Sequence, residues 1–427
     1  MSKTTDGKQY NRRLIDDTVE KYLRNAGAVC IEGPKWCGKT WTCTMHAKSE
    51  FLVGSPAGNF ANRQLARLDV NRALNGEAPH LIDEWQEVPA IWDAVRASVD
   101  DRTESGRYLL TGSATPQRKG VLHSGIGRIA RLAMHPMSLQ EYGRSAGVVS
   151  LKDVCAGKDI GVESIPSPEL EELIELVMRG GWPGGIGKNA AQALLIPKDY
   201  IENVIDIDML KLDDVERDPV KVRKCLRSLA RNESTTASTN TIRNDIAEFD
   251  DATLSINTVT DYIAAFNRLF LLRDTKPFST FLRSPVRIKQ SAKRRFCDPS
   301  LAAALLKATP KLLLRDLRTF GLLFESLVMR DLEIYAEAME GELYHYQDYD
   351  GDDFDAVIQT PDNGWSAFEI KLDPGQVDEA ATSLVRIASK FKHNPPTSLG
   401  VIVGKSGIAY RRKEDGVYVL PITALRA

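Results

Sequence analysis

A glycine-rich segment between two apolar stretches constrains this chain more than any other feature. Residues 33–40 read Gly-Pro-Lys-Trp-Cys-Gly-Lys-Thr and match G-x-x-x-x-G-K-[ST] at every fixed position. The apolar residues 28–31 before it predict a buried strand, and residues 41–46 after it can begin a helix. Strand, glycine loop and helix in this order form a phosphate-binding loop, because backbone N–H groups and a helix N-terminus then face the phosphate oxygens. The alternative is a chance match among ordinary loop glycines, and the flanking segments argue against it.

We expect this loop to bind ATP. Lys39 is predicted to reach the β- and γ-phosphates, and the Thr40 hydroxyl is predicted to bind Mg²⁺ beside them. The other residues expected to line the nucleotide site are Gly33, Pro34, Lys35, Trp36, Cys37, Gly38 and Trp41. Oxidation of the Cys37 thiol is a further hypothesis, because a modified loop would block nucleotide entry. The alternative is that this cysteine is only a small loop residue.

Two adjacent carboxylates follow a second apolar stretch. Residues 80–82 lead into Asp83 and Glu84, as expected of a strand that ends beside the phosphate loop. Asp83 is then predicted to hold Mg²⁺, and Glu84 is predicted to act as the general base on the attacking water. The end of a third strand, over residues 107–113, carries Thr111 and Ser113, and either hydroxyl can sense the γ-phosphate. The alternatives are a solvated strand end for the carboxylates and turn capping for the hydroxyls.

Composition excludes several classes of protein. The 427 residues are 43% hydrophobic and 27% charged, as in ordinary globular proteins, and the net charge of −2 gives no overall attraction to nucleic acid or to an anionic membrane. The six cysteines have no C-x-x-C spacing, which argues against a zinc site or a disulfide framework. No apolar run reaches the length of a membrane span, and the first nine residues lack the apolar core of a signal peptide. We expect a cytoplasmic protein without a membrane partner.

Three regions are predicted along the chain, giving an α/β protein. Residues 12–145 alternate strands and helices, so we expect a mainly parallel sheet covered by helices. Residues 167–310 are mostly helical, and their order of three helices and a strand hairpin is typical of a winged helix-turn-helix. Residues 312–427 return to mixed α/β structure.

A basic stretch lies near the predicted wing. It consists of Arg283, Arg287, Lys289, Lys293, Arg294 and Arg295. Such a run is commonly a solvated face, and the alternative is contact with the phosphate backbone of DNA.

A second set of charged residues lies near the C-terminus. Glu369 and Lys371 share one face of a predicted strand, and Asp355 lies on the strand before it, with Glu325 on the preceding helix. Asp355 and Glu369 can bind a divalent cation, with Lys371 and Glu325 beside them, and such a site can position water against a phosphodiester. The spacing D-x₁₃-E-x-K is similar to that of the restriction-endonuclease-like fold. The alternative is a polar sheet face on which Glu369 and Lys371 form a weak surface pair.

Several segments together resemble the bacterial and archaeal AAA+-type ATPases that join an N-terminal P-loop domain to a C-terminal domain of unknown function. These segments are residues 33–40, 81–89, 109–114, 127–142, 180–183, 354–358 and 368–372. The resemblance implies a P-loop ATPase domain, a winged-helix-like middle and a restriction-endonuclease-like end. It departs from the endonuclease-like pattern at Phe354, where proline usually precedes the first aspartate.

The same resemblance identifies Arg128 as a candidate catalytic arginine. Arg128 stands in the Gly-Arg pair before the segment Pro-Met-Ser-Leu, and it would stabilise developing phosphate charge in its own chain or from a neighbouring subunit of a homo-oligomer. Arg131 is the second choice, and a structural salt bridge is the alternative for either arginine.

The leading hypothesis is therefore a Mg²⁺-dependent ATPase, with Lys39 and Glu84 essential, whose nucleotide state moves the winged-helix-like and endonuclease-like modules. Two alternatives stay open. One is a DNA-binding regulator for which ATP is only a switch ligand, and the other is a metal-dependent DNA nuclease that acts through the C-terminal region.

Overall fold

The computed structural model divides the chain into two units. Unit 1 consists of Met1–Pro136, Ile207–Glu216 and Ala264–Leu271, and unit 2 consists of Met137–Asp206, Arg217–Ile263 and Leu272–Ala427. The structure describes all residues except 1–3, 6, 7, 102, 103, 116–122, 214, 251, 252 and 280–290. Each unit is described by itself.

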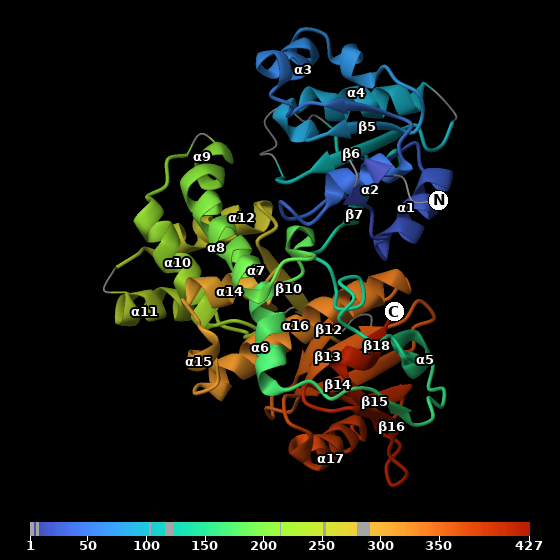
Figure 1. Ribbon diagram of the computed structural model, residues 1–427, viewed down its shortest axis with the longest axis vertical. Helices are drawn as coiled ribbons and strands as arrows, with labels where there is room; N and C mark the ends of the chain where they lie inside the picture. Colours follow the sequence, from blue (N-terminus) through green and yellow to red (C-terminus); the bar gives the residue numbers. More distant parts are fainter. Residues whose placement is uncertain are drawn as a thin grey trace. The chain divides into compact units, whose positions relative to one another are not determined.

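A five-stranded parallel sheet forms the centre of unit 1 (Figure 1). Its strands, in sheet order, are β4 (Ser49–Leu52), β5 (His80–Asp83), β6 (Tyr108–Gly112), β3 (Ala28–Glu32) and β7 (Ile129–Ala133). β3 and β6 are apolar and almost completely buried, as central strands of a sheet covered on both faces should be. The prediction of a parallel sheet covered by helices is confirmed.

Helices cover both faces of this sheet. Alternate residues of β3 point to opposite faces, so Val29 and Ile31 pack with α1 (Ile15–Asn25) and α2 (Lys39–His46), whereas Ala28 and Cys30 pack with α4 (Ala90–Asp100). The remaining elements of the first 100 residues are β1 (Thr4–Thr5), β2 (Lys8–Gln9), α3 (Ala57–Leu68) and the 3₁₀ turns η1 (Val70–Leu74) and η2 (Trp85–Glu87). Because all five strands run in the same direction, the loops after β3, β5 and β6 gather at one edge of the sheet.

Helices dominate the middle of the chain. They are α6 (Leu170–Arg179), α7 (Ala190–Ala193), α8 (Leu195–Asn203), α9 (Met209–Lys211), α10 (Pro219–Arg231), α11 (Thr239–Phe249), α12 (Ile256–Arg268), α14 (Pro299–Leu305) and α15 (Pro310–Leu313). A 3₁₀ turn, η3 (Pro183–Gly185), follows α6, and a π-helical turn, η4 (Val204–Asp208), connects α8 to α9. The helical character expected for this region is thus observed.

A nine-stranded mixed sheet forms the second part of unit 2. Its strands, in sheet order, are β11 (Lys293–Phe296), β10 (Leu272–Pro277), β12 (Glu342–Gln347), β13 (Asp353–Gln359), β14 (Trp365–Lys371), β15 (Ser398–Val403), β17 (Tyr418–Pro421), β16 (Ile408–Arg411) and β9 (Glu163–Ser164). The long helix α16 (Leu317–Ala338) precedes β12, and α17 (Val377–Ala388) buries its apolar face against β14 and β15. The turns η5 (Pro374–Gln376) and η6 (Ile422–Ala424) complete this region.

Sheet pairing joins segments that the sequence analysis assigned to different regions. The hairpin β10–β11 follows α12, as predicted, but β10 also pairs in parallel with β12, with Lys276 opposite Tyr344. The segment before residue 167 contributes β8 (Val149–Ser150), α5 (Leu151–Cys155) and β9. β8 pairs with β18 (Leu425–Arg426), and β9 pairs with β16. The helical middle and the C-terminal region therefore share unit 2, because main-chain hydrogen bonds of one sheet connect them.

Candidate functional site

The loop between β3 and α2 takes the shape that its glycines permit. Gly38 lies at φ 107°, and Trp36 at φ 62°, so the chain turns twice through left-handed conformations before α2 begins at Lys39. A Cβ atom at Gly33 would lie 2.2 Å from the carbonyl oxygen of Met134, at the end of the neighbouring strand β7. Only glycine fits there without moving the main chain, so the entry of the loop is fixed by the sheet itself.

Lys39 and Thr40 point from the start of α2 to the edge where the strands end. The ammonium of Lys39 donates hydrogen bonds to the carbonyl oxygens of Gly33 (3.0 Å) and Pro34 (2.8 Å), and the side chain is buried. The hydroxyl of Thr40 donates to Oδ1 of Asp83 at 2.8 Å. The loop thus carries a cation and a hydroxyl within the space that it encloses.

Asp83 and Glu84 diverge at the end of β5. Oδ1 of Asp83 also accepts a hydrogen bond from Thr111 of β6 at 2.6 Å, while Glu84 adopts φ 55° and its carboxylate accepts from Ser113 at 2.7 Å. Burial raises the pKa of Asp83, and the hydrogen bonds from Thr111 and Thr40 oppose that shift. The carboxylate of Asp83 therefore lies beside the hydroxyl of Thr40, whereas that of Glu84 binds a different donor, Ser113. This separation agrees with the different roles expected for the two residues.

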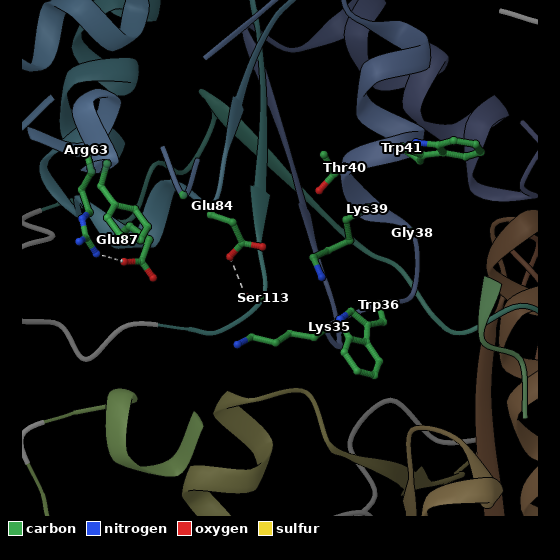
Figure 2. Close-up of a pocket in the computed structure, with 12 residues that line it drawn as sticks. Lys35, Trp36, Gly38, Lys39, Thr40, Trp41, Arg63, Glu84, Glu87 and Ser113 are labelled. Carbon is green, nitrogen blue, oxygen red and sulfur yellow. Dashed lines mark hydrogen bonds and ion pairs between the residues drawn. The ribbon is translucent and has the colours of Figure 1, made fainter. Parts of the chain in front are cut away.

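A cavity of about 540 Å³ connects these groups within unit 1 (Figure 2). The residues that line it are Lys35, Trp36, Gly38, Lys39, Thr40, Trp41, Gly54, Phe60, Arg63, Glu84, Glu87 and Ser113. Eight of these were predicted from the sequence. Gly54, Phe60, Arg63 and Glu87 were not, because they reach the cavity from the turn after β4, from α3 and from η2, and no local sequence pattern marks these positions.

Two predicted loop residues, Lys35 and Cys37, have side chains that contact groups other than those of the cavity. Lys35 lines the cavity, but its ammonium pairs at 2.5 Å with Asp208, a buried carboxylate of the π-helical turn. The side chain of Cys37 is fully buried in the apolar cluster beneath the loop, with Sγ 3.7 Å from the carbonyl oxygen of Met134. The hypothesis of Cys37 oxidation therefore fails on access, and only the main chain of this residue is available to a ligand.

The arginines identified by the resemblance lie elsewhere on the sheet. Arg128 precedes β7 and pairs with Asp100 at 2.6 Å, at the end of the sheet opposite to the phosphate loop, because Ala28 and Ile129 are partners at the start of two parallel strands. Arg131 lies halfway along β7, with its guanidinium 4.6 Å from the ring centre of Trp92. Neither lines the cavity of its own chain, so that part of the prediction is wrong. Action of Arg128 on a neighbouring subunit stays a prediction.

The C-terminal acidic residues come together at one end of β13 and β14. Oδ2 of Asp355 accepts a hydrogen bond from the main chain of Ile370 at 2.8 Å, and Lys371 pairs with Glu369 at 2.8 Å. Glu325, from α16, pairs with Lys293, whose ammonium also lies 3.6 Å from Asp355. This cluster therefore holds two lysines among its carboxylates.

Burial dominates the electrostatics of this cluster. It raises the pKa of both Glu325 and Glu369, and the nearby charge of Asp355 raises them further. Burial alone would lower the pKa of Lys293, but the charges of Glu325 and Asp355 raise it. A proton or a cation is thus favoured at each of these carboxylates.

The basic stretch does not provide a free cationic surface in its described part. Arg294 pairs with Asp274 at 2.8 Å, Arg295 is buried and pairs with Glu333, and Lys293 is part of the acidic cluster. Arg283, Arg287 and Lys289 lie outside the described residues. The prediction of DNA backbone contact by residues 293–295 is therefore not supported, because their charges are already neutralised by neighbouring carboxylates.

Comparison with known proteins assigns three adjacent domains. Residues 25–143 match the AAA domain, residues 170–312 match a domain of unknown function (DUF8612), and residues 320–425 match a second domain of unknown function (DUF4143). Uncharacterized proteins of Mycobacterium tuberculosis and Mycobacterium bovis are each 29% identical over 138 residues, which is 32% of this chain and 31% of theirs. The chain thus matches about a third of the length of these curated relatives.

One solved structure spans more of the chain. A Walker-type ATPase of Pyrococcus abyssi is 14% identical and covers 72% of this chain and 98% of its own, with a TM-score of 0.43. Among the residues that the structure describes, none of the helices is both long enough and apolar enough to cross a bilayer. The match of residues 25–143 supports an AAA-type P-loop ATPase domain in this part of the chain, and the match of residues 320–425 places a domain of unknown function after it.

Proposed function

We propose that this protein binds ATP and hydrolyses it with the help of Mg²⁺ in the cavity of unit 1. The observation that carries the proposal is the meeting of three elements at one carboxylate. Thr40 of α2 and Thr111 of β6 both donate to Asp83 of β5, and Lys39 and Glu84 line the cavity beside it. A solvated strand end would not bring a loop hydroxyl, a cation and two divergent carboxylates to one space.

The side chains fit a nucleotide and a magnesium ion. Mg²⁺ prefers oxygen ligands and is commonly held by a P-loop hydroxyl and an aspartate, and Thr40 and Asp83 supply that pair. Lys39 lies against two carbonyl oxygens of its own loop, and a phosphate would offer its ammonium a stronger, charged acceptor. When bound, Mg²⁺ neutralises charge on the β- and γ-phosphates.

The residues of the chain then have separate roles. Lys39 and the N–H groups of the loop bind and orient the phosphates, with α2 adding its N-terminal partial charge. Glu84 accepts a proton from the attacking water, and Ser113 and Gln86, which both hydrogen-bond to its carboxylate, position it. Gln86 also donates to Ser113 at 3.3 Å, so the three side chains form one connected set.

Lys39→Ala tests the site directly. We expect this variant to lose ATP turnover and to weaken ATP binding strongly, as measured by phosphate release and by calorimetry with Mg²⁺ present. Lys48→Ala is the matched control, because Lys48 lies just beyond α2, is exposed and pairs with the exposed Glu77. If Lys39→Ala binds and hydrolyses ATP like Lys48→Ala, the proposed function is wrong.

We further propose that nucleotide state is transmitted to the segments of the middle region that belong to unit 1. Lys35 pairs with Asp208, and Arg268 of α12 pairs with Asp213 at 2.7 Å and donates to the carbonyl oxygen of Thr115 at 3.1 Å. Thr115 lies two residues after Ser113, so a movement of Ser113 on nucleotide binding would act on these contacts. Asp208→Asn should change the protection of residues 207–216 from hydrogen exchange on ATP addition. Unchanged protection in both wild type and variant would contradict the coupling.

A second candidate function is cleavage of DNA with a divalent cation at the C-terminal cluster. The favourable observation is that Asp355, Glu369 and Glu325 come together with Lys371 beside them, and that α16, three strands, α17 and β15 follow one another as in the restriction-endonuclease-like fold. The ammonium of Lys293 forms ion pairs with two of these carboxylates, Glu325 and Asp355, so a metal ion would have to displace it.

Plasmid nicking with Mn²⁺ or Mg²⁺ tests this second function. We expect cleavage to be lost in Asp355→Ala and in Lys371→Ala, and to be kept in Asp362→Ala, a control at an exposed turn after β13. The absence of cleavage by the wild type with either metal would contradict the nuclease role and leave the ATPase proposal unaffected.

A further inference from the structure

One wall of the nucleotide cavity is formed by an arginine that the sequence analysis did not identify. Arg63 of α3 lines the cavity together with Phe60 and Glu87, on the far side of Glu84 from the phosphate loop (Figure 2). Figure 2 shows Glu84 between the pair of Arg63 with Glu87 and the side chains of Lys39 and Thr40. The three cations that line the cavity, among the residues described, are Lys35, Lys39 and Arg63.

Several contacts hold Arg63 in this wall. Its guanidinium lies 4.6 Å from the ring centre of Phe60, which adopts a left-handed conformation (φ 60°) three residues earlier, and it pairs with Glu87 at 3.2 Å. Glu87 ends the 3₁₀ turn that begins directly after Glu84, so its position is tied to the predicted general base. Asn62 donates to the carbonyl oxygen of Leu52 at 3.0 Å, which fastens the helix to the end of β4.

Lys35 and Arg63 differ in how deeply their carboxylate partners are buried, and this difference decides which of the two cations can turn toward a phosphate. The side chain of Asp208, the partner of Lys35, is only 7% exposed, so withdrawal of Lys35 would leave a buried carboxylate without its counter-ion. The side chain of Glu87, the partner of Arg63, is 43% exposed, so water can solvate it when Arg63 leaves. Exchange of its carboxylate partner for a doubly charged phosphate is therefore favourable for Arg63, which leaves the partly exposed Glu87, and unfavourable for Lys35, which would leave the buried Asp208.

The orientation of a bound triphosphate follows from the proposed function, on which this inference rests. With Lys39 on the β- and γ-phosphates, Thr40 and Asp83 at the magnesium and Glu84 at the water, the terminal phosphate faces the wall that contains Arg63. Charge on the equatorial oxygens of that phosphate must be neutralised as the bond to the leaving oxygen breaks, and a guanidinium can bind two of these oxygens at once.

We propose that Arg63 is a catalytic residue that binds the terminal phosphate of ATP within its own chain, and that Glu87 holds it when no nucleotide is bound. Arg63 takes the place that the sequence analysis gave to Arg128. No neighbouring subunit is required for this contact, since α3 belongs to the same unit as the phosphate loop.

The experiment compares Arg63→Ala, Arg63→Lys and Arg67→Ala in the full-length chain. Arg67 lies one turn further along α3, is exposed and does not line the cavity, so Arg67→Ala makes the same chemical change on the same helix. Phosphate release gives kcat and KM, calorimetry gives the affinity for ATP, and a second calorimetric titration gives the affinity for ADP with aluminium fluoride, which mimics the phosphate in transfer. Thermal unfolding of each variant verifies that α3 is intact.

We expect Arg63→Ala to lower kcat about 100-fold or more, as loss of an arginine at the transferring phosphate does in other P-loop enzymes. ATP affinity should change little, whereas the affinity for ADP with aluminium fluoride should fall in parallel with kcat. Arg63→Lys should recover part of the rate, and Arg67→Ala should behave as wild type.

Two results would overturn the proposal, and they are distinguishable. If wild type hydrolyses ATP and Arg63→Ala does so at the rate of Arg67→Ala, the role of Arg63 is wrong while the ATP site stands. If wild type neither binds nor hydrolyses ATP, the proposed function itself fails and the role of Arg63 fails with it.

Discussion

The hydroxyl of Ser113, in the loop after β6, donates a hydrogen bond of 2.7 Å to the carboxylate of Glu84 at the end of β5. Gln86 donates to the same carboxylate oxygen, and the main-chain N–H of Glu84 donates to Thr111 at 2.9 Å. The main chain of Glu84 is therefore held by Thr111 of the neighbouring strand, and its carboxylate is held by Ser113 and Gln86. A general base that must meet one water molecule benefits from such fixed geometry.

Ser113→Ala should lower kcat about tenfold, because a hydrogen bond to a charged group is worth about 1.5–3 kcal/mol. ATP affinity should stay close to that of wild type, since Ser113 acts through Glu84. Ser113→Thr keeps the hydroxyl and should restore the rate. Steady-state phosphate release separates kcat from KM, and a Ser113→Ala enzyme as fast as wild type would show that this hydrogen bond does not position the base.

Glu84→Gln should keep ATP binding and slow turnover about 10²–10⁴-fold, the range that a positioned base contributes. The amide oxygen of glutamine can still accept from Ser113, so the fold of the site is retained while the proton acceptor is lost. The matched control is Glu50→Gln on β4, where the carboxylate is exposed and outside the cavity. Single-turnover measurements give the rate of the chemical step, and equal rates in both variants would contradict the role of Glu84.

The nucleotide site could be predicted in large part because its chemistry is local. The turn at Gly33 and Gly38, the hydroxyl at Thr40 and the carboxylates after β5 each follow directly from a short segment, and the parallel sheet brings the strand ends to one edge. Arg63 could not be predicted, because it reaches the cavity only through the packing of α3 beyond β4. Arg128 was placed by analogy, and the parallel register of β3 and β7 puts it at the other end of the sheet.

The basic stretch shows a second limit of the sequence. Lys293, Arg294 and Arg295 are adjacent in the chain, but alternate strand residues point to opposite faces. Lys293 and Arg295 therefore meet Glu325 and Glu333 of α16, whereas Arg294 meets Asp274 of β10. A run of basic residues within a strand therefore does not by itself predict one cationic surface. The carboxylates that neutralise it lie on β10, β13 and α16, which no local pattern connects with residues 293–295.

A buried charge network in unit 2 lies beside Met137 and Gly181, which belong to two of the segments that carry the family resemblance. Arg330 of α16 pairs with Asp298 at 2.8 Å and with Asp331 at 2.7 Å, and all three side chains are fully buried. Asp298 also accepts from the main chain of Gly181 at 2.9 Å, and Gly181 accepts from Met137 at 2.6 Å. The segments around residues 137 and 181 are thus joined by a direct main-chain hydrogen bond, and Arg330 supports the second of them through Asp298.

Arg330→Leu should destabilise unit 2 by about 3–5 kcal/mol, because it leaves two buried carboxylates without their counter-ion. The control is Arg318→Leu, a change in the exposed first turn of the same helix. Urea denaturation followed by circular dichroism measures both. Equal midpoints for the two variants would show that the network contributes no more than a surface charge.

Glu233 gives unit 2 a pH dependence of known sign. Its buried carboxyl accepts from the Ser326 hydroxyl at 2.6 Å and from the main chain of Phe296, yet burial outweighs these donors and raises its pKa to about 8. In the unfolded chain the group titrates near the ordinary value for glutamate, about 4.3. Between these two values the folded state binds the proton that the unfolded state has lost, so stability falls as pH rises through this window.

Glu233→Gln should therefore flatten the decline in unfolding temperature between about pH 5 and pH 8, since glutamine keeps an acceptor for Ser326 without an ionisable proton. The same variant should be more stable than wild type at pH 8, where wild type begins to bury a charge. Glu325 and Glu369, whose pKa values are also raised, remain in this variant and should still contribute to the decline of the unfolding temperature with pH. Glu248→Gln, at an exposed site on α11, is the control and should leave the slope unchanged. If the unfolding temperature of Glu233→Gln declined with pH as steeply as that of wild type, the Glu233 carboxyl would be ionised in the folded protein. Its removal would then not change the difference in proton binding between the folded and unfolded states.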